Sequence, residues 1–173
     1  MNGLVSTSSP PWWVRVAVGR SPKRTLIRAA VLGLTLVVVF RFVLLPIRVK
    51  GISMDPTYPD HAVNFINRCA FVMHPPRRGD VVGIRYSGRK VMLLKRIIGL
   101  PGERLRITHG IVFINGQPLQ EPYLAHTPEP WQRPEIELGA NQYFVIGDNR
   151  TMDPESHDFG EVDGNRILGK LLF

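Results

Sequence analysis

Residues 78–98 predict a β-hairpin, and they read Arg78-Gly-Asp-Val-Val-Gly-Ile-Arg85, Tyr86-Ser-Gly-Arg89 and Lys90-Val-Met-Leu-Leu-Lys-Arg-Ile-Ile98. The first and third runs are short and rich in Val, Ile and Leu, which is typical of strands, and the run between them is typical of a turn. Short apolar runs between Gly and Pro residues continue along most of the chain. The sequence therefore predicts a mostly β fold with antiparallel sheet.

Downstream of this hairpin, four more apolar runs predict strands at residues 104–107, 110–114, 142–147 and 166–173. Asn115-Gly116 follows the second of these runs. It predicts a two-residue hairpin turn, because both residues tolerate positive φ. We expect the strands to form one antiparallel β domain.

Two other segments carry their own predictions. Residues 120–141 are polar and rich in proline, which predicts a loop outside the core. The sole cysteine, Cys69, lies in the apolar run Cys69-Ala-Phe-Val-Met73. It has no partner for an internal disulfide, and we expect a buried small hydrophobe there.

Upstream, Leu26–Ile47 is almost entirely apolar. As a helix these residues would span about 33 Å, close to the hydrocarbon thickness of a bilayer. Arg28 and Arg41 can reach the headgroups by extending their side chains. A cleaved signal peptide is the alternative, but the apolar core is too long and no small-x-small site follows it. The segment therefore predicts one retained transmembrane anchor.

The charge of the chain is concentrated near the anchor. The net charge is +8, and residues 1–50 hold eight Lys and Arg residues and no acidic residue, so residues 51–173 are formally neutral. This distribution argues against nucleic-acid binding, which needs a basic face on the folded domain. It also predicts a cytoplasmic N-terminus in the cell (inner or plasma) membrane, because positive charge precedes the span at Arg15, Arg20, Lys23, Arg24 and Arg28.

The expected organisation has three parts. Residues 1–25 form a basic cytoplasmic segment, residues 26–47 form the single transmembrane anchor, and residues 48–173 form an extracytoplasmic domain. Membrane lipid is thus one expected partner. The five histidines have no metal-ligand spacing, so we expect no metal site.

Ser53 and Lys95 are the candidate catalytic residues. Ser53 lies shortly after the anchor in the run Gly51-Ile-Ser-Met-Asp-Pro-Thr57, and Lys95 lies in the second strand of the hairpin. Adjacent residues of a strand face opposite sides, so Lys95 and Arg96 cannot share a face. One of them must project into a core or a cleft. A serine protease that uses lysine needs no histidine or aspartate triad.

A lysine base must be neutral at the working pH, whereas its unperturbed pKa is about 10.4. A desolvating apolar shell would lower that pKa, and Met54, Leu93 and Ile97 can provide one. The neutral amine would take the Ser53 hydroxyl proton as the oxygen attacks a peptide carbonyl. The Ser53 backbone N–H would stabilise the oxyanion.

Four segments that follow the anchor carry a family resemblance. In chain order they are Gly51-Ile-Ser-Met-Asp-Pro-Thr57, Arg78-Gly-Asp-Val-Val82, Leu94-Lys-Arg-Ile-Ile-Gly-Leu-Pro-Gly-Glu103, and Gly147-Asp-Asn-Arg150 with Ser156 and Phe159-Gly160. In this order they resemble the boxes of the type I signal peptidases, the membrane-anchored Ser-Lys proteases of peptidase family S26. The resemblance extends from the anchor to Gly169.

The resemblance implies Ser53 as nucleophile, Lys95 as general base, a β-rich signal-peptidase-like catalytic fold, and no metal or cofactor. It implies that the partners are signal peptides of exported preproteins, cut after small residues, commonly Ala-x-Ala, on the outer face of the membrane. We also expect six residues to support the site, with Asp148 and Arg150 holding a tight turn through charge-assisted hydrogen bonds. The six are Met54, Leu93, Asp148, Arg150, Asp153 and Ser156.

The chain departs from the family's pattern in two places. Gly51 stands where some members have a serine that donates to the oxyanion. In the last box, Asp153 replaces the serine that hydrogen-bonds the lysine amine, Glu155 replaces Asp, and His157 replaces Arg. We expect Asp153 to face Lys95, where an ionised carboxylate would favour the charged amine. The alternatives are that Asp153 turns away or shares a proton with Lys95.

The leading function is the removal of signal peptides from exported preproteins. One alternative is a dedicated processing peptidase for a single exported substrate, of the conjugation or pilin type or of the organelle inner-membrane type. Another is an inactive homologue that binds signal peptides, which only Asp153 favours. A self-cleaving regulator of related fold would need a DNA-binding domain, and residues 1–50 predict an anchor instead.

Overall fold

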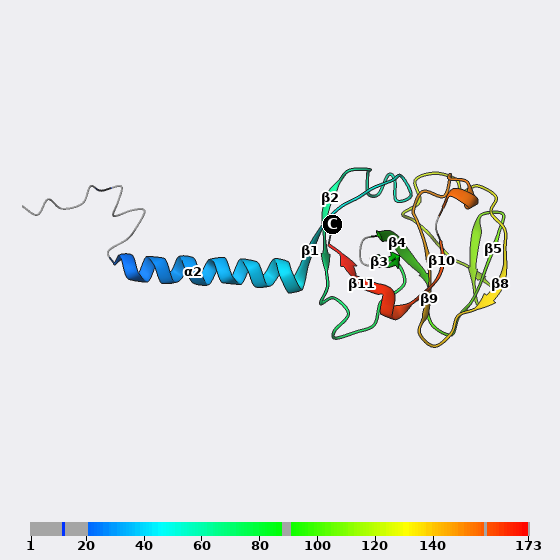
Figure 1. Cartoon of the computed structure of the whole chain (residues 1–173). Helices are drawn as coiled ribbons and strands as arrows, with labels where there is room; N and C mark the ends of the chain where they lie inside the picture. Colours follow the sequence, from blue (N-terminus) through cyan, green and yellow to red (C-terminus); the bar gives the residue numbers. More distant parts are fainter. Residues whose placement is uncertain (1–11, 13–20, 88–90, 158, 173) are drawn as a thin grey trace, which may run out of the picture. The chain divides into compact units, whose positions relative to one another are not determined.

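The computed structural model describes residues 12, 21–87, 91–157 and 159–172 (Figure 1). The chain divides into two compact units, Met1–Arg41 and Phe42–Phe173. The first contains most of an apolar helix, and the second contains the last two residues of that helix and the described strands.

The apolar helix consists of α2 (Pro22–Val38) and a π-helical turn, η1 (Val39–Val43). Pro22 stands at the first helical turn, where its missing N–H needs no partner. None of the α2 side chains is buried against protein. The 22 residues from Pro22 to Val43 are long and apolar enough to cross a bilayer. The single N-terminal anchor is therefore consistent with the structure.

The helix ends at Val43, four residues before the expected end at Ile47. Residues Leu44–Arg48 instead form strand β1, which pairs with β2 (Val63–Asn67). Leu45 and Ile47 pack against the buried core cluster around Met54. Hydropathy alone cannot separate an apolar strand from the end of an apolar helix. With this boundary, Arg41 lies in the last turn of the helix, where its charge readily reaches the headgroups.

The larger sheet has seven strands in the spatial order β1-β2-β11-β3-β4-β9-β10. Every pairing in it is antiparallel. The remaining strands of this sheet are β3 (Val81–Ser87), β4 (Val91–Gly99), β9 (Gln142–Ile146), β10 (Gly160–Asp163) and β11 (Ile167–Leu171). The hairpin predicted at residues 78–98 is the pair β3–β4. Part of its turn, residues 88–90, lies outside the described residues.

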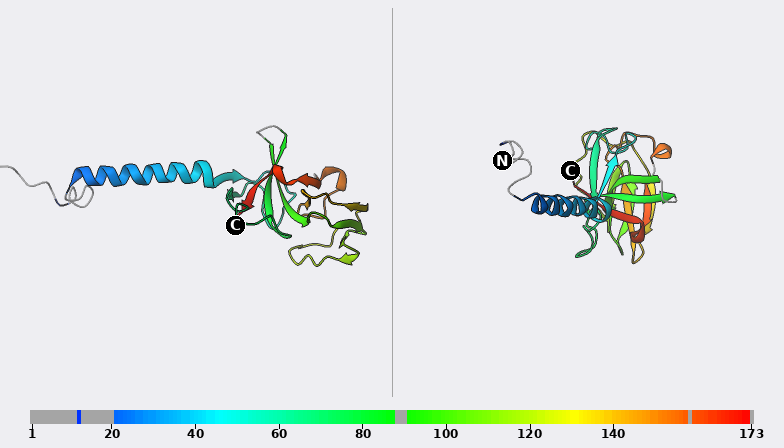
Figure 2. Two further views of the ribbon diagram at one scale, coloured as in Figure 1. Left: turned by 90° about the horizontal axis from the view of Figure 1, so that it is seen from below. Right: turned by 60° about the vertical axis from the view of Figure 1, so that its left-hand side comes forward.

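The smaller sheet has the order β7-β6-β5-β8, and it lies at the end of the domain away from β1 and β2 (Figures 1 and 2). Its strands are β5 (Arg104–Thr108), β6 (Ile111–Ile114), β7 (Gln117–Pro118) and β8 (Arg133–Glu137). The predicted turn joins β6 to β7, with φ of 50° at Asn115 and 82° at Gly116. The expected fold, a mostly antiparallel β domain behind one N-terminal helix, is confirmed.

The prediction for residues 120–141 is wrong. This segment contains β8, which pairs with β5, and two buried side chains, Trp131 and Leu138. Both side chains belong to the core cluster around Phe144. Two apolar residues among many prolines and charged residues give no strand-like period. The sequence pattern therefore does not reveal that this segment covers the core.

The prediction for Cys69 is also wrong, because the cysteine is exposed. Its segment lies in the turns that follow β2, where Val72 and Met73 are 76% and 91% exposed. Of this apolar run, Phe71 packs against the core cluster that contains Val82 and Ile97.

Candidate active site

Ser53 lies in the loop that connects β1 with β2. The segment begins at Gly51, whose φ of 91° is a conformation that side chains with a Cβ rarely adopt. The Gly51 N–H donates to the Asp60 carboxylate at 2.9 Å, and the same oxygen accepts the His61 N–H. A serine at position 51 would strain this loop. The backbone thus accounts for the glycine that departs from part of the family.

Ser53 lines a groove of about 330 Å³. One wall is residues 46–51 with Met54, and the other wall is Met92, Leu93 and Leu94 of β4. Strand β9 pairs with β4 only from Arg96 to Gly99. Among the described residues, no strand therefore lies beside the Met92–Leu94 edge that faces away from β3. The groove has the shape and the free backbone edge that an extended peptide can use.

Lys95 lies in β4 directly after this free edge. It pairs with Val82 of β3, and only 2% of its surface is exposed. The next residue, Arg96, pairs with Ile146 of β9. Continuing this antiparallel register places Gly147 opposite Lys95. Lys95 therefore occupies the buried position that the alternation of β4 predicts for one member of the Lys-Arg pair.

Gly147 lies next to both Lys95 and Ser53. A Cβ at Gly147 would lie 2.1 Å from the Ser53 carbonyl oxygen and 2.7 Å from Nε2 of His157. The Asn149 N–H donates to the Ser53 carbonyl at 3.1 Å, and the Asn149 amide donates to the Ile52 carbonyl at 3.0 Å. The fold thus brings the backbone of Ser53 and the strand position of Lys95 to one glycine.

Asp148 is held by Arg96. Its carboxylate accepts from Nε and Nη2 of Arg96 at 2.7 and 2.5 Å, and both side chains are largely buried. Arg96 also donates to the Gly79 carbonyl at 2.8 Å. Asp148 therefore fixes the turn that follows β9, residues 148–150, to β4, the strand that carries Lys95. We call residues 148–150 the last turn.

Arg150 is held by a residue that the sequence analysis missed, Glu121. The two form a buried ion pair, with 2% and 7% of the side chains exposed, and Arg150 Nε also donates to the Gly147 carbonyl at 3.0 Å. Tyr123 donates to Glu121 at 2.5 Å and lies 4.0 Å from the Arg96 guanidinium. Burial, and then the Glu121 charge, raises the pKa of Tyr123. In the sequence, the only sign of this ion pair was Glu121 and Tyr123 themselves, and both lie in the segment that was predicted to be a loop.

Asp153 turns outward, unlike the expected approach to Lys95. The residue is exposed, and its carboxylate accepts the Glu155 N–H at 3.0 Å as the cap of the short helix η2 (Pro154–Ser156). Ser156 is also exposed. The Asp-Pro-Glu run favours this cap, because an aspartate before a helical turn accepts the free N–H groups of that turn. Of the six supporting residues, Met54 and Leu93 line the groove, and Asp148 and Arg150 anchor the last turn.

His157, rather than Asp153, is the buried residue of this segment. It is 3% exposed, and its Nε2 accepts the Gly147 N–H at 2.9 Å. Trp131 and Phe159 pack edge-on against the ring, with centroids 5.1 and 5.8 Å away. Burial, the Lys95 charge and the Arg150 charge lower the pKa of His157 to about 3. The sequence analysis noted His157 only as a replacement for arginine.

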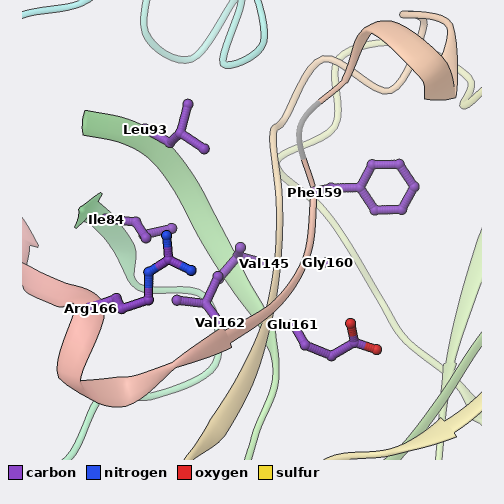
Figure 3. A pocket seen from close by; sticks show the side chains of 8 residues that line it. All are labelled: Ile84, Leu93, Val145, Phe159, Gly160, Glu161, Val162 and Arg166. Atoms are coloured by element: carbon purple, nitrogen blue, oxygen red, sulfur yellow. The ribbon is translucent and has the colours of Figure 1, made fainter. Parts of the chain in front are cut away.

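A second, smaller pocket of about 100 Å³ lies on the face of β4 that carries Leu93 (Figure 3). Ile84, Val145 and Val162 line it, and Arg166 lies beside them. The Phe159 ring points away from Leu93 in this view. Neither Ser53 nor Lys95 lines this pocket, so the groove is the better candidate for substrate.

Comparison with known families identifies the group to which the chain belongs. A family model described as "Signal peptidase, peptidase S26" matches residues 23–173, most of the chain. The chain belongs to this family. Membership places it among the serine endopeptidases, a class of hydrolases, and the apolar helix fits the membrane anchoring of the family.

Named signal peptidases are similar over much of their length. The signal peptidase I of Bacillus licheniformis is 30% identical over 158 residues, which is 85% of each chain. A probable signal peptidase I of Synechocystis is 32% identical over 140 residues, covering 76% of this chain and 71% of the relative. The signal peptidase I of Leptolyngbya laminosa is 34% identical over 128 residues, covering 69% of this chain. The match spans 63% of that relative's length.

One solved structure is also similar. It is a signal peptidase I of Enterococcus faecalis, with 29% identity and a TM-score of 0.45. The alignment covers 56% of this chain and 97% of that chain.

Proposed function

We propose that this signal peptidase family member removes N-terminal signal peptides from exported preproteins, with Ser53 as nucleophile and Lys95 as general base. The observation that carries the proposal is that Ser53 lines the groove while Lys95 lies buried one residue beyond the free strand edge of that groove. Both residues neighbour Gly147. The family to which the chain belongs supports the same roles.

The substrate would bind as an extended strand. Its backbone would pair with the free edge at Met92–Leu94, and side chains before the cut would enter the groove beside Met54. Met54, Met92, Leu93 and Leu94 supply apolar surface that suits short apolar side chains, and Arg48 and Lys50 add positive charge to the lining. These features suit the Ala-x-Ala pattern that family members cleave.

The chemistry would follow from burial of the lysine. Removing an ammonium group from water disfavours its charged form, so a buried Lys95 is favoured as a neutral base. The amine would take the Ser53 Oγ proton as Oγ attacks the scissile carbonyl, and it would return that proton to the leaving amine. A water molecule would then hydrolyse the acyl-enzyme, with the amine again accepting a proton. The Ser53 N–H would stabilise the oxyanion.

The protein would work at a membrane surface. We infer a cytoplasmic N-terminus and an extracytoplasmic catalytic domain in the cell (inner or plasma) membrane, since Lys23, Arg24 and Arg28 lie at the start of the apolar helix. Exported substrates would reach the groove while their signal peptides are still in the bilayer. Signal peptides and membrane lipid are thus the proposed partners, and nucleic acid is not.

Cleavage of a fluorogenic peptide with an Ala-x-Ala site tests this function. The full-length chain in detergent should cut after the second alanine, as mass spectrometry of the products would show. Ser53→Ala should lower kcat at least about 1,000-fold, and Lys95→Arg should do the same because arginine cannot serve as a neutral base. Peptide binding without cleavage would instead indicate an inactive signal-peptide-binding homologue. Cleavage of one exported substrate but not of this generic peptide would indicate a dedicated processing peptidase.

A further inference from the structure

We propose that His157 is a positioning residue, whose neutral imidazole holds Gly147 against the backbone of the nucleophile. The inference rests on the proposed roles of Ser53 and Lys95. His157 stands where the last box of the family commonly has arginine, so this device belongs to the present chain.

The first support is the contact geometry around Gly147. The Gly147 N–H is buried and donates to His157 Nε2 at 2.9 Å. The Ser53 carbonyl oxygen and His157 Nε2 both lie within 3 Å of the point that a Cβ of Gly147 would occupy. The imidazole and the nucleophile's backbone therefore close on the same side of one glycine. A shift of the His157 ring can therefore displace the Ser53 backbone through Gly147 alone.

The second support is the protonation state that this contact requires. Because the Gly147 N–H is a donor, Nε2 must be unprotonated, and a neutral ring then has its proton on Nδ1. Nδ1 is buried and makes no hydrogen bond of normal geometry among the described residues, although the Asn149 backbone acts on the ring as an acceptor that raises its pKa against the larger lowering effects. The contact with Gly147 thus fixes both the charge and the tautomer of the ring.

The surroundings keep the ring neutral. Burial disfavours a charged ring, and the cation Arg150 from the last turn, with Lys95 from β4 whenever its amine is protonated, opposes a further positive charge. Trp131 and Phe159 exclude water from its edges. The Gly147 contact therefore persists throughout the pH range in which a lysine base would act.

The consequence concerns the placement of Ser53. His157 holds Gly147, and the same turn holds the Ser53 and Ile52 carbonyls through Asn149. Without an acceptor at His157, the buried Gly147 N–H must move to find a partner, and the turn moves with it. A displacement of about 1 Å at a reacting group can lower the rate about 100-fold. His157 does not line the groove, so substrate binding should change little.

Two substitutions at position 157 test the proposal in the full-length chain. His157→Gln keeps a neutral acceptor near the place of Nε2, whereas His157→Leu removes the acceptor at similar bulk. We expect His157→Gln to retain at least a third of the wild-type kcat and His157→Leu to lose at least 10-fold. KM for the Ala-x-Ala peptide should change less than threefold in both. His126→Leu, the same change at an exposed loop position, is the matched control and should leave kcat unaltered.

Two outcomes would overturn the proposal. If His157→Leu kept the wild-type kcat, the ring would only fill space. If both variants were inactive, and the wild-type pH–rate profile had a limb near the ordinary histidine pKa of about 6.5, His157 would itself carry the proton.

Amide hydrogen exchange at Gly147 supplies a readout that needs no activity. Exchange should be slow in the wild-type chain and in His157→Gln, and at least 10-fold faster in His157→Leu. The ring 15N shifts should show an Nδ1–H tautomer that does not titrate between pH 5 and 8. If the wild-type chain failed to cleave, the proposed function would fall while these measurements still decided the positioning role. Fast exchange in the wild-type chain would overturn the positioning role alone.

Discussion

Gly147 is the residue on which the candidate site depends most directly. A side chain there would collide with the Ser53 carbonyl oxygen, 2.1 Å from the Cβ position, and with His157. Neither group is the free end of a flexible chain. The last turn and the Ser53 loop can approach each other only because this position has no Cβ.

Gly147→Ala should therefore remove activity by displacing Ser53. We expect a loss of kcat/KM of at least about 100-fold, since the reacting hydroxyl would move by an ångström or more. The measurement is peptide cleavage by the full-length variant. Gly116→Ala is the control, because no atom lies near its Cβ position and it is far from the groove, although its φ of 82° will reduce stability slightly. Wild-type activity in Gly147→Ala would show that the contact with Ser53 is not needed.

Asp153 gives a prediction about pH. Its carboxylate caps η2 and is exposed to solvent, so its charge should be screened from the buried Lys95 amine. Asp153→Ser, which restores the family residue, should leave the rising limb of the kcat/KM profile within about 0.3 pH units, a differential interaction below about 0.5 kcal/mol. A limb that moved a full unit to lower pH would show that Asp153 does face the lysine in solution.

His157 predicts how stability depends on pH. Its pKa of about 3 in the folded chain lies below its ordinary value. Between these values the unfolded chain binds more protons than the folded chain, so the free energy of unfolding falls as pH drops from about 6.5 toward 3, by at most about 1.4 kcal/mol per pH unit from this group. His157→Gln should weaken this acid sensitivity. Denaturant unfolding at pH 7 and pH 4.5 measures the difference, and an equal loss in both chains would contradict the assignment.

At the scale of elements, the last turn is fixed to two neighbours by buried ion pairs. Asp148 joins it to β4 through Arg96, and Arg150 joins it to the covering segment through Glu121. A buried ion pair adds little net stability, but removing one partner leaves an unpaired charge. These pairs therefore specify where the turn lies, and Ser53 depends on that position.

Glu121→Gln should destabilise the domain by about 3–5 kcal/mol, because Arg150 would keep its charge at 2% exposure without a carboxylate. Glu135→Gln is the matched control: its pair with Arg104 is exposed at 3.8 Å and should contribute under about 1 kcal/mol. Denaturant unfolding of the two variants, monitored by tryptophan fluorescence, compares them. Equal midpoints for both would contradict the structural role of the buried pair.

The elements also show which parts of the fold a pattern can predict. The hairpin β3–β4 and the Asn115-Gly116 turn were predictable, because strand periodicity and turn chemistry are local properties. The end of the helix was not, since Leu45 and Ile47 are equally apolar in a bilayer and in a sheet. Trp131 and Leu138 are buried by distant strands, which no local pattern reports.

The candidate site also has residues that the sequence could predict and residues that it could not. Ser53 and Lys95 were named from local motifs and their order, and the structure brings their backbones to one glycine. The partners of the last turn were not predictable. Glu121 reaches Arg150 from a segment of irregular sequence, and Asp153 turns outward because its own helical turn competes for the carboxylate. Side-chain direction in a loop is decided by such competition, which the residue type does not reveal.

At the scale of the whole molecule, the chain separates charge and apolar surface along its length. The excess positive charge lies in residues 1–50, whereas residues 51–173 are neutral overall. The apolar helix Pro22–Val43 has no side chain buried against protein, so a bilayer is the environment that fits it. One helix and one charge gradient together predict how the protein is oriented in the membrane.

This gradient predicts the side of the membrane on which the catalytic domain lies. A reporter that matures only outside the cytoplasm, joined by a flexible linker after Phe173, should be active. The linker matters because Leu171 is buried in β11, between β2 and β3, while Leu172 is exposed. Replacing Lys23, Arg24 and Arg28 with glutamine should lower the active fraction, because positive charge retains the N-terminal flank in the cytoplasm. The same change at Arg104, Arg106 and Arg133, far from the helix in sequence, should not alter it. An inactive reporter on a well-expressed chain would put the groove on the cytoplasmic side, where no exported preprotein is cut, and would contradict the proposed function together with the topology.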